Sequence, residues 1–203
     1  MVSSTTARVV PSLVPRRASG DVLGSKLVDY TINLLPDKKM DSVIRLLLQS
    51  QPDDLETINQ TMYDPVRCQP IAISIETKTP DAPEQDAMVQ LGVWVAAHFN
   101  RLRMLSHEDP VSLILPLLYV SGTQWFLLFA CDSAQKIVCC FLIYLACQFL
   151  TFQQELLGKL LIGDTATIVG CYKLLATLRC LCGWVMTTFK DWLELKVLGL
   201  SNR

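Results

Sequence analysis

The chain has 203 residues, which is enough for one domain with a sizeable core. Hydrophobic residues make up 51% of the chain, charged residues make up only 18%, and the formal net charge is −1. This balance excludes a strongly basic protein that binds nucleic acid through its bulk charge. Any binding of nucleic acid therefore requires a local basic patch or a metal site.

The cysteine distribution argues against a secreted disulfide scaffold. Six of the eight cysteines lie inside apolar, helix-like stretches, where free cysteine behaves as a small hydrophobe: Cys139, Cys140, Cys147, Cys171, Cys180 and Cys182. None of their spacings matches the CxxC pattern of zinc ribbons. The first twenty residues are rich in Ser, Thr, Arg and Pro rather than forming an apolar signal peptide. We therefore expect an intracellular protein, in the nucleus or the cytoplasm, with reduced thiols.

The first third of the chain predicts a short strand followed by a helix. Residues 1–24 contain several Pro and Gly residues and predict a flexible lead-in. Residues 26–35 alternate between apolar and polar side chains, which is typical of a strand, and Asp29 lies on the polar side. Residues 38–49 predict an amphipathic helix, and residues 57–62 a short strand.

The middle of the chain has the strongest local patterns. Residues 70–79 predict a strand, and after two prolines the apolar spacing over 84–104 predicts a helix. The apolar runs 111–120 and 124–131 are joined at Ser121-Gly122, which is typical of a β-hairpin.

The last part of the chain predicts two closing helices, over 165–182 and 184–196. The order of elements predicts an α/β fold in which helices flank a mixed central β-sheet. We expect a single domain over residues 25–196, followed by a tail over 197–203.

One segment does not fit this pattern. Residues 137–152 form an uncharged apolar run of 16 residues, whereas a membrane span needs roughly 20. The run is therefore too short to predict a membrane partner, although attachment to a membrane through it stays an alternative.

The strand over 70–79 carries the residues with the clearest chemistry. Side chains alternate across a strand, so Glu76 and Lys78 are neighbours on one face, roughly 6–7 Å apart. A buried ion pair gives weak stabilisation, so a carboxylate and an amine in this apolar strand require another explanation. A metal site supplies one, because the carboxylate binds Mg²⁺ and the ammonium orients the attacking water or offsets phosphate charge.

A single carboxylate holds Mg²⁺ poorly, so a second is expected on a neighbouring strand. Asp29 fits because it interrupts an apolar strand on its polar side. Asp64 is the rival, but Pro65 places it in a turn, where Asp usually makes local hydrogen bonds. We prefer Asp29, although it would equally suit an exposed position on an edge strand.

Three strings of residues resemble the fungal PD-(D/E)XK nuclease-like domain proteins. They are Val28-Asp29-Tyr30, Ser74-Ile75-Glu76-Thr77-Lys78-Thr79-Pro80 and Gln90-Leu91-Gly92-Val93-Trp94. Segments that are similar to the C-terminal part of this family follow at 162–165, 172–176 and 184–192. The resemblance covers roughly residues 25–196. The ExK motif alone occurs often by chance, whereas the extended strings are much more specific.

The resemblance implies a restriction-endonuclease-like core with a Mg²⁺ site, at which Mn²⁺ can substitute. Asp29 and Glu76 would match the acidic metal ligands, and the main-chain carbonyl of Thr77 would complete the metal's inner coordination. Lys78 would match the catalytic lysine. Gln90 would match a glutamine that some branches of the superfamily place beside the site, although it would equally suit a helix surface.

The chain departs from the family at two places. The helix that usually precedes the Asp strand would fall within residues 1–24, which predicts an N-terminally shortened chain. Residues 137–155 lack the resemblance, and similar proteins would run fairly directly from Phe129-Ala130-Cys131 to the segment at 162–165. We interpret 137–155 as an atypical insert, and a retained intron or an incorrect gene model is one hypothesis for its origin.

The resemblance predicts hydrolysis of phosphodiester bonds in DNA or RNA by a metal-activated water. Arg101 and Arg103, with Lys190 and Lys196, are candidate phosphate contacts, although scattered cations are usually only solvated. A catalytically inactive nuclease-fold module that binds a partner is the main alternative, because the chain lacks overall basicity and the first helix is missing.

Overall fold

The fold is a six-stranded mixed sheet. The computed structural model describes residues 1–4, 8–15, 28–132 and 154–200, and for residues 154–157 it describes the backbone alone. The strands follow one another in chain order: β1 (Val2–Ser4), β2 (Tyr30–Asn33), β3 (Ile71–Lys78), β4 (Leu115–Ser121), β5 (Gln124–Asp132) and β6 (Gln154–Asp164). β3 and β4 are parallel, and every other neighbouring pair is antiparallel.

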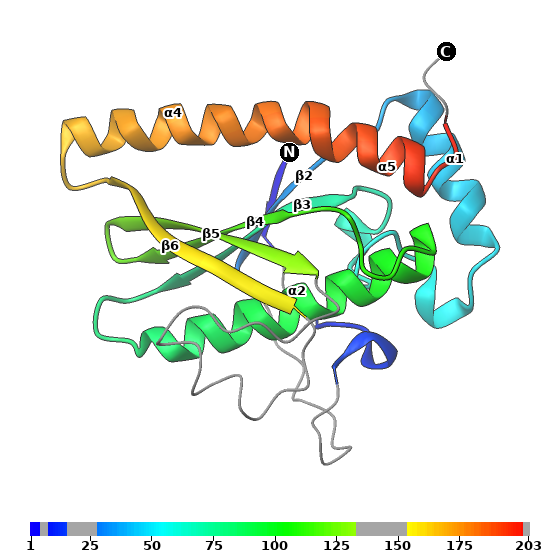
Figure 1. Ribbon diagram of the computed structural model, residues 1–203, viewed down its shortest axis with the longest axis horizontal. Coiled ribbons are helices and arrows are strands. Elements are labelled where there is room, and N and C mark those ends of the chain that lie inside the picture. The colour runs from blue at the N-terminus through cyan, green and yellow to red at the C-terminus, as the bar shows by residue number, and fades with distance from the viewer. Residues whose placement is uncertain (5–7, 16–27, 133–153, 201–203) are drawn as a thin grey trace.

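Helices cover both faces of this sheet (Figure 1). α2 (Glu84–Ser106) crosses one face. On the other face, α4 (Ile168–Trp184) continues through a π-helical turn (Val185–Phe189) into α5 (Lys190–Lys196). α1 (Lys38–Gln49) lies at one end of the sheet (Figure 1). The predicted α/β architecture, a mixed sheet flanked by helices, is therefore confirmed.

Local sequence signals explain where the helices begin and how closely they approach the sheet. The Asp37 carboxylate accepts from the Met40 amide at 2.9 Å and caps α1. Thr167 accepts from the Gly170 amide at 3.0 Å and caps α4. A Cβ at Gly163 would lie 2.7 Å from the Gly170 carbonyl oxygen, so only glycine allows β6 and α4 to pack this closely.

The N-terminal residues differ from the predicted flexible lead-in. The sequence predicts a flexible lead-in over 1–24, but β1 pairs with β2, and a 3-10 turn follows at Pro11–Leu13. Val10 and Leu13 are buried in the core. The lead-in prediction is therefore wrong for residues 1–4 and 8–15, because apolar side chains among the prolines find a place in the core. Residues 16–27 lie outside the described residues.

The predicted strand at 57–62 is also wrong. Thr61 makes only an isolated bridge to Val9. The buried side chain of Asn59 donates to the Val66 carbonyl at 2.5 Å and accepts from the Ile71 amide at 2.8 Å. This segment is buried although most of its residues are polar. The side chains of Thr57 and Arg101, rather than a strand ladder, bond to its backbone.

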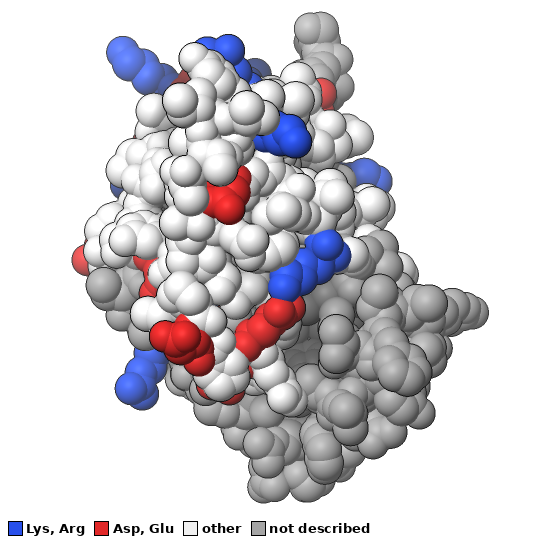
Figure 2. All heavy atoms as spheres, turned by 90° about the vertical axis from the view of Figure 1, so that its left-hand side faces the viewer, with Lys and Arg blue, Asp and Glu red and all other residues white. Residues whose placement is uncertain are grey.

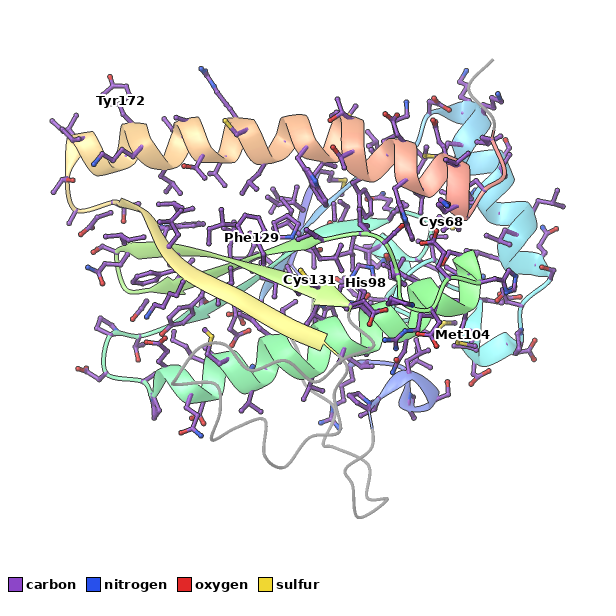
Figure 3. The ribbon with its side chains drawn as sticks, viewed as in Figure 1. Cys68, His98, Met104, Phe129, Cys131 and Tyr172 are labelled. Atoms are coloured by element: carbon purple, nitrogen blue, oxygen red, sulfur yellow. The ribbon has the colours of Figure 1, made fainter. Side chains whose placement is uncertain are left out.

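The C-terminal helices differ from the prediction in two ways. The two predicted helices form one continuous helical segment, in which Gly183 lies inside α4 instead of ending a helix. Cys180 and Cys182 are exposed rather than packed in the core. Tyr172 points away from the sheet on the outer side of α4 (Figure 3).

This helical segment, Ile168–Lys196, is long and apolar enough to cross a membrane by length and composition alone. Its inner side packs on the sheet, where Leu174 and Leu181 are buried. The core helix of a soluble protein can pass the same test of length and composition, so the segment is weak evidence for a membrane span.

The apolar run at 137–152 lies outside the described residues, as does most of the predicted insert at 137–155. Gln154 and Glu155 are described, and they begin β6, which pairs along β5. The end of the predicted insert thus leads directly into β6, which extends to Asp164 in the segment at 162–165.

Candidate active site at the end of β3

The even-numbered side chains of β3 face α2. The Ser74 hydroxyl accepts from the Trp94 indole N–H at 2.9 Å, and the Lys78 ammonium donates to the Gln90 side-chain oxygen at 2.7 Å. Glu76 lies between these two residues on the same side of the strand. The structure therefore brings Glu76, Lys78 and Gln90 together between the sheet and α2.

Glu76 is buried, and only one of its two carboxylate oxygens has a partner. Its Oε1 is ion-paired with the Lys78 ammonium, and its Oε2 is buried without a hydrogen-bond partner. Burial raises the pKa of Glu76, and the negative charge of Asp29 raises it further, whereas the hydrogen bond from Lys78 acts in the opposite direction. The net direction is upward, so the site disfavours the ionised carboxylate.

Asp29 reaches the motif from the neighbouring strand. Tyr30 pairs with Ile75 across the antiparallel β2–β3 ladder, so the next position places Asp29 opposite Glu76. The Asp29 Oδ2 accepts from the Thr77 amide at 2.8 Å and from the Thr77 hydroxyl at 2.5 Å. Asp29 thus lies beside the motif, just outside β2, and its hydrogen bonds are to Thr77.

The rival carboxylate Asp64 lies elsewhere. It begins the 3-10 turn Asp64–Val66 and is exposed. It lines a cavity of about 520 Å³ together with Arg45 and Arg67, and none of the motif residues lines that cavity. The geometry therefore favours Asp29 as the partner of Glu76.

The donor set at this site suits a hard divalent cation. Within the part of the chain that the structure describes, no three His, Cys, Asp or Glu side chains gather closely enough to hold a metal. The site instead combines two carboxylates with the main chain of Thr77, and carboxylate and carbonyl oxygens are the ligands that Mg²⁺ prefers. The unpartnered Oε2 of Glu76 is an acceptor that a cation would satisfy.

The candidate phosphate contacts Arg101 and Arg103 bond to other parts of the fold, and Lys190 and Lys196 are ion-paired with Glu194 and Glu108. Arg101 is buried, and its guanidinium donates to the main-chain carbonyls of Leu55 and Thr57 at 2.7 to 2.9 Å. Burial lowers the pKa of Arg101 to about 10. Arg103 is ion-paired with Asp132. Both arginines hold the fold together.

Sequence reasoning missed residues on the neighbouring strands. Tyr119 of β4 pairs with Glu76 of β3, and its ring stacks on that of Phe126 with centroids 5.7 Å apart. Lys159 of β6 lies over both rings and is ion-paired with Glu84. These residues meet only through strand pairing, so no local motif could have indicated them.

A family model described as the PD-(D/E)XK nuclease superfamily matches residues 1–190. The chain belongs to the PD-(D/E)XK nuclease superfamily. No curated protein and no solved structure matches the chain. The predicted family and its restriction-endonuclease-like fold are confirmed, while a fungal origin stays a prediction. The match includes residues 1–24, which the sequence places outside the domain.

Proposed function

We propose that this chain is a nuclease that hydrolyses phosphodiester bonds of DNA or RNA with the help of Mg²⁺, for which Mn²⁺ can substitute. The observation that supports this most is the buried Oε2 of Glu76, which has no hydrogen-bond partner. An unsatisfied buried acceptor costs about 1–3 kcal/mol. A cation bound at this oxygen would remove that cost, which gives the family's metal site a physical reason in this chain.

The carboxylates of Asp29 and Glu76 and the main-chain carbonyl of Thr77 would hold the cation. The hydrogen bonds from Thr77 to Asp29 do not exclude this role, because a carboxylate has about four lone-pair positions. A bound divalent cation supplies a lowered pKa for the attacking water and neutralises charge on the phosphate.

Lys78 would contact the water or the phosphate directly. Its ammonium donates to Glu76 and to Gln90, and an ammonium has three N–H donors, so one is left for a further contact. Its side chain is 21% exposed, so a substrate can reach it. Gln90 is then a positioning residue that holds the Lys78 ammonium beside Glu76.

A second function is favoured by one specific contact. Because Asp29 accepts both donors of Thr77, the end of β3 is held in place without a cation. A nuclease fold stabilised in this way could serve as a non-catalytic binding module. A nucleic acid is the partner that we propose for the nuclease, and we propose that the protein works inside the cell, in the nucleus or the cytoplasm.

Cleavage and cation binding, measured separately, distinguish the two functions. Labelled DNA and RNA would be incubated with the wild type, Lys78→Ala and the matched control Lys38→Ala, in Mg²⁺ and in Mn²⁺. Lys38 is an exposed residue of α1. We expect Lys78→Ala to lose roughly 10²-fold or more of the cleavage rate, because an aligned proton donor or acceptor contributes about that much.

Calorimetry with Mg²⁺ completes the test. We expect Lys78→Ala to retain cation binding and Glu76→Gln to lose it. Equal cleavage by the wild type and Lys78→Ala would refute the assigned role of the lysine. A wild type that binds nucleic acid but neither binds the cation nor cleaves would establish the binding module instead.

A further inference from the structure

A cation is held over two aromatic rings on the α2-facing side of the sheet. The Lys159 ammonium lies 4.1 Å from the centroid of the Phe126 ring and 5.5 Å from that of Tyr119. It also donates to the Glu84 carboxylate at 2.6 Å. Because Glu84 is the first residue of α2, this ion pair joins the edge strand β6 to the helix that carries Gln90.

Strand pairing relates this cation to the proposed catalytic residues. Tyr119 pairs with Glu76 between β3 and β4, and Phe126 pairs with Tyr119 between β4 and β5. Directly paired residues point to the same face of a sheet. Neighbouring strands lie about 4.8 Å apart, so the ammonium over Phe126 is roughly 10 Å from the strand that carries Glu76.

The surroundings of Lys159 are those of a residue that can exchange partners. Its side chain is 34% exposed and that of Glu84 is 47% exposed, and ion pairs this open to water contribute little to stability. The rings below hold the aliphatic chain and the ammonium in one place without using its N–H donors. A phosphate could therefore replace the carboxylate of Glu84 without moving the lysine.

On the face shown in Figure 2, basic and acidic side chains are scattered among uncharged ones and do not form a continuous basic surface in the described part of the chain. With a net charge of −1, the chain also lacks a bulk attraction for a polyanion. A single well-placed lysine would then have a measurable share in binding.

We propose that Lys159 binds a backbone phosphate of the nucleic acid near the phosphate that is cleaved, and that Glu84 occupies Lys159 until this phosphate displaces it. This inference rests on the proposed function. At 3.4 Å per nucleotide along one strand, a separation of about 10 Å corresponds to roughly three nucleotides. Lys159 would thus contact the backbone within a few nucleotides of the phosphate that is cleaved.

Salt dependence of binding tests the contact. The dissociation constant of a fluorescein-labelled DNA duplex would be measured by anisotropy between 50 and 200 mM KCl, without divalent cations so that no cleavage occurs. Lys159→Met keeps an aliphatic cover on the rings and removes the charge. Glu84→Gln frees the lysine. Lys173→Ala, which changes an exposed lysine of α4 on the opposite face of the sheet, is the matched control.

We expect Lys159→Met to bind DNA more weakly than the wild type. A plot of the logarithm of the association constant against the logarithm of the salt concentration should be less steep by about 0.9, the value for one phosphate contact on B-DNA. The loss of affinity between 50 and 200 mM KCl would then be about threefold smaller than in the wild type. Glu84→Gln should bind more tightly than the wild type, and Lys173→Ala should match the wild type.

The outcomes separate this inference from the proposed function. If Lys78→Ala abolishes cleavage while Lys159→Met keeps the wild-type slope, the lysine contact is wrong and the nuclease function stands. Weaker binding by Glu84→Gln would overturn the displacement of its carboxylate. If Lys159→Met makes the salt dependence less steep but the wild type does not cleave, the phosphate contact is supported and the proposed nuclease activity is wrong. A wild type that binds neither this duplex nor the same sequence as labelled RNA overturns the contact.

Discussion

Replacing Glu76 by Gln is expected to stabilise the metal-free protein, although it removes a carboxylate of the proposed site. Burial and the charge of Asp29 raise the pKa of Glu76 above its ordinary value of 4.5. An acid whose pKa is higher in the folded state destabilises the fold when it is ionised. Wild-type stability is therefore lost as the pH rises from 4.5 through the folded-state pKa, and Glu76→Gln avoids this loss.

The structure sets the size of the gain. Glu76→Gln removes the buried charge, and each unit by which folding raises the pKa of Glu76 costs the ionised wild type about 1.4 kcal/mol. For a chain of about this size, 1 kcal/mol changes the melting temperature by roughly 2–4 °C. We expect Glu76→Gln to melt higher than the wild type by a few degrees at pH 7.5, and by progressively less as the pH falls toward 4.5.

Circular dichroism melts between pH 4 and pH 8 would measure this difference, first in EDTA and then in Mg²⁺. Magnesium should raise the melting temperature of the wild type, since a ligand at 100 times its Kd adds about 2.7 kcal/mol, and should not raise that of Glu76→Gln. The control Glu56→Gln alters a carboxylate whose ion pair with Arg67 is partly exposed. A variant less stable than the wild type at pH 7.5 in EDTA would refute the reasoning.

Two further substitutions test the core beside the site. Burial lowers the pKa of His98, which lies between α2 and the sheet (Figure 3), from 6.5 to about 4. The wild type should therefore lose about 3 kcal/mol of stability as the pH falls from 6.5 to 4, and denaturant melts of His98→Gln should show a smaller loss over that range. Arg101→Met leaves the carbonyls of Leu55 and Thr57 without their donor, so it should lower the free energy of unfolding by roughly 3 kcal/mol or more. A loss below 1 kcal/mol in urea unfolding would show that water replaces the guanidinium.

The elements that the sequence predicts well are those with a strong local pattern. The predicted helix at 38–49 is α1, and the predicted strand at 70–79 contains β3, because capping residues, prolines and regular apolar spacing are encoded locally. The prediction of a strand at 57–62 is wrong because the partners of this segment are not encoded locally. Its burial is real, but the side chains of Thr57 and Arg101 replace strand partners, and Arg101 comes from a distant part of the chain.

The candidate site divides in the same way. Glu76, Lys78 and Gln90 are recognisable from spacing and resemblance, because one strand and the following helix carry all three. The position of Asp29 depends on the β2–β3 register, and the sequence alone left Asp64 as a rival. Lys159 depends on the pairing of β6 with β5 and joins the site only in three dimensions.

The two carboxylates of the proposed site are not equivalent in the metal-free protein, and this difference gives a final prediction. Asp29 accepts the amide and the hydroxyl of Thr77, whereas half of the Glu76 carboxylate has no partner. Asp29→Asn weakens the two hydrogen bonds from Thr77, and its amide group can turn an N–H toward those donors. Hydrogen bonds to a charged group contribute about 1.5–3 kcal/mol, so the variant should unfold more easily than the wild type.

The pair of variants should therefore shift stability in opposite directions in EDTA, while both weaken binding of Mg²⁺. Urea unfolding at pH 7.5 would measure the first effect and calorimetry the second. Thr77→Val separates the two contributions, because it removes the hydroxyl donor to Asp29 and keeps the main-chain amide and carbonyl. If Asp29→Asn and Glu76→Gln instead changed stability in the same direction, the two carboxylates would be playing the same structural role, and the unpartnered oxygen of Glu76 could not be what drives cation binding.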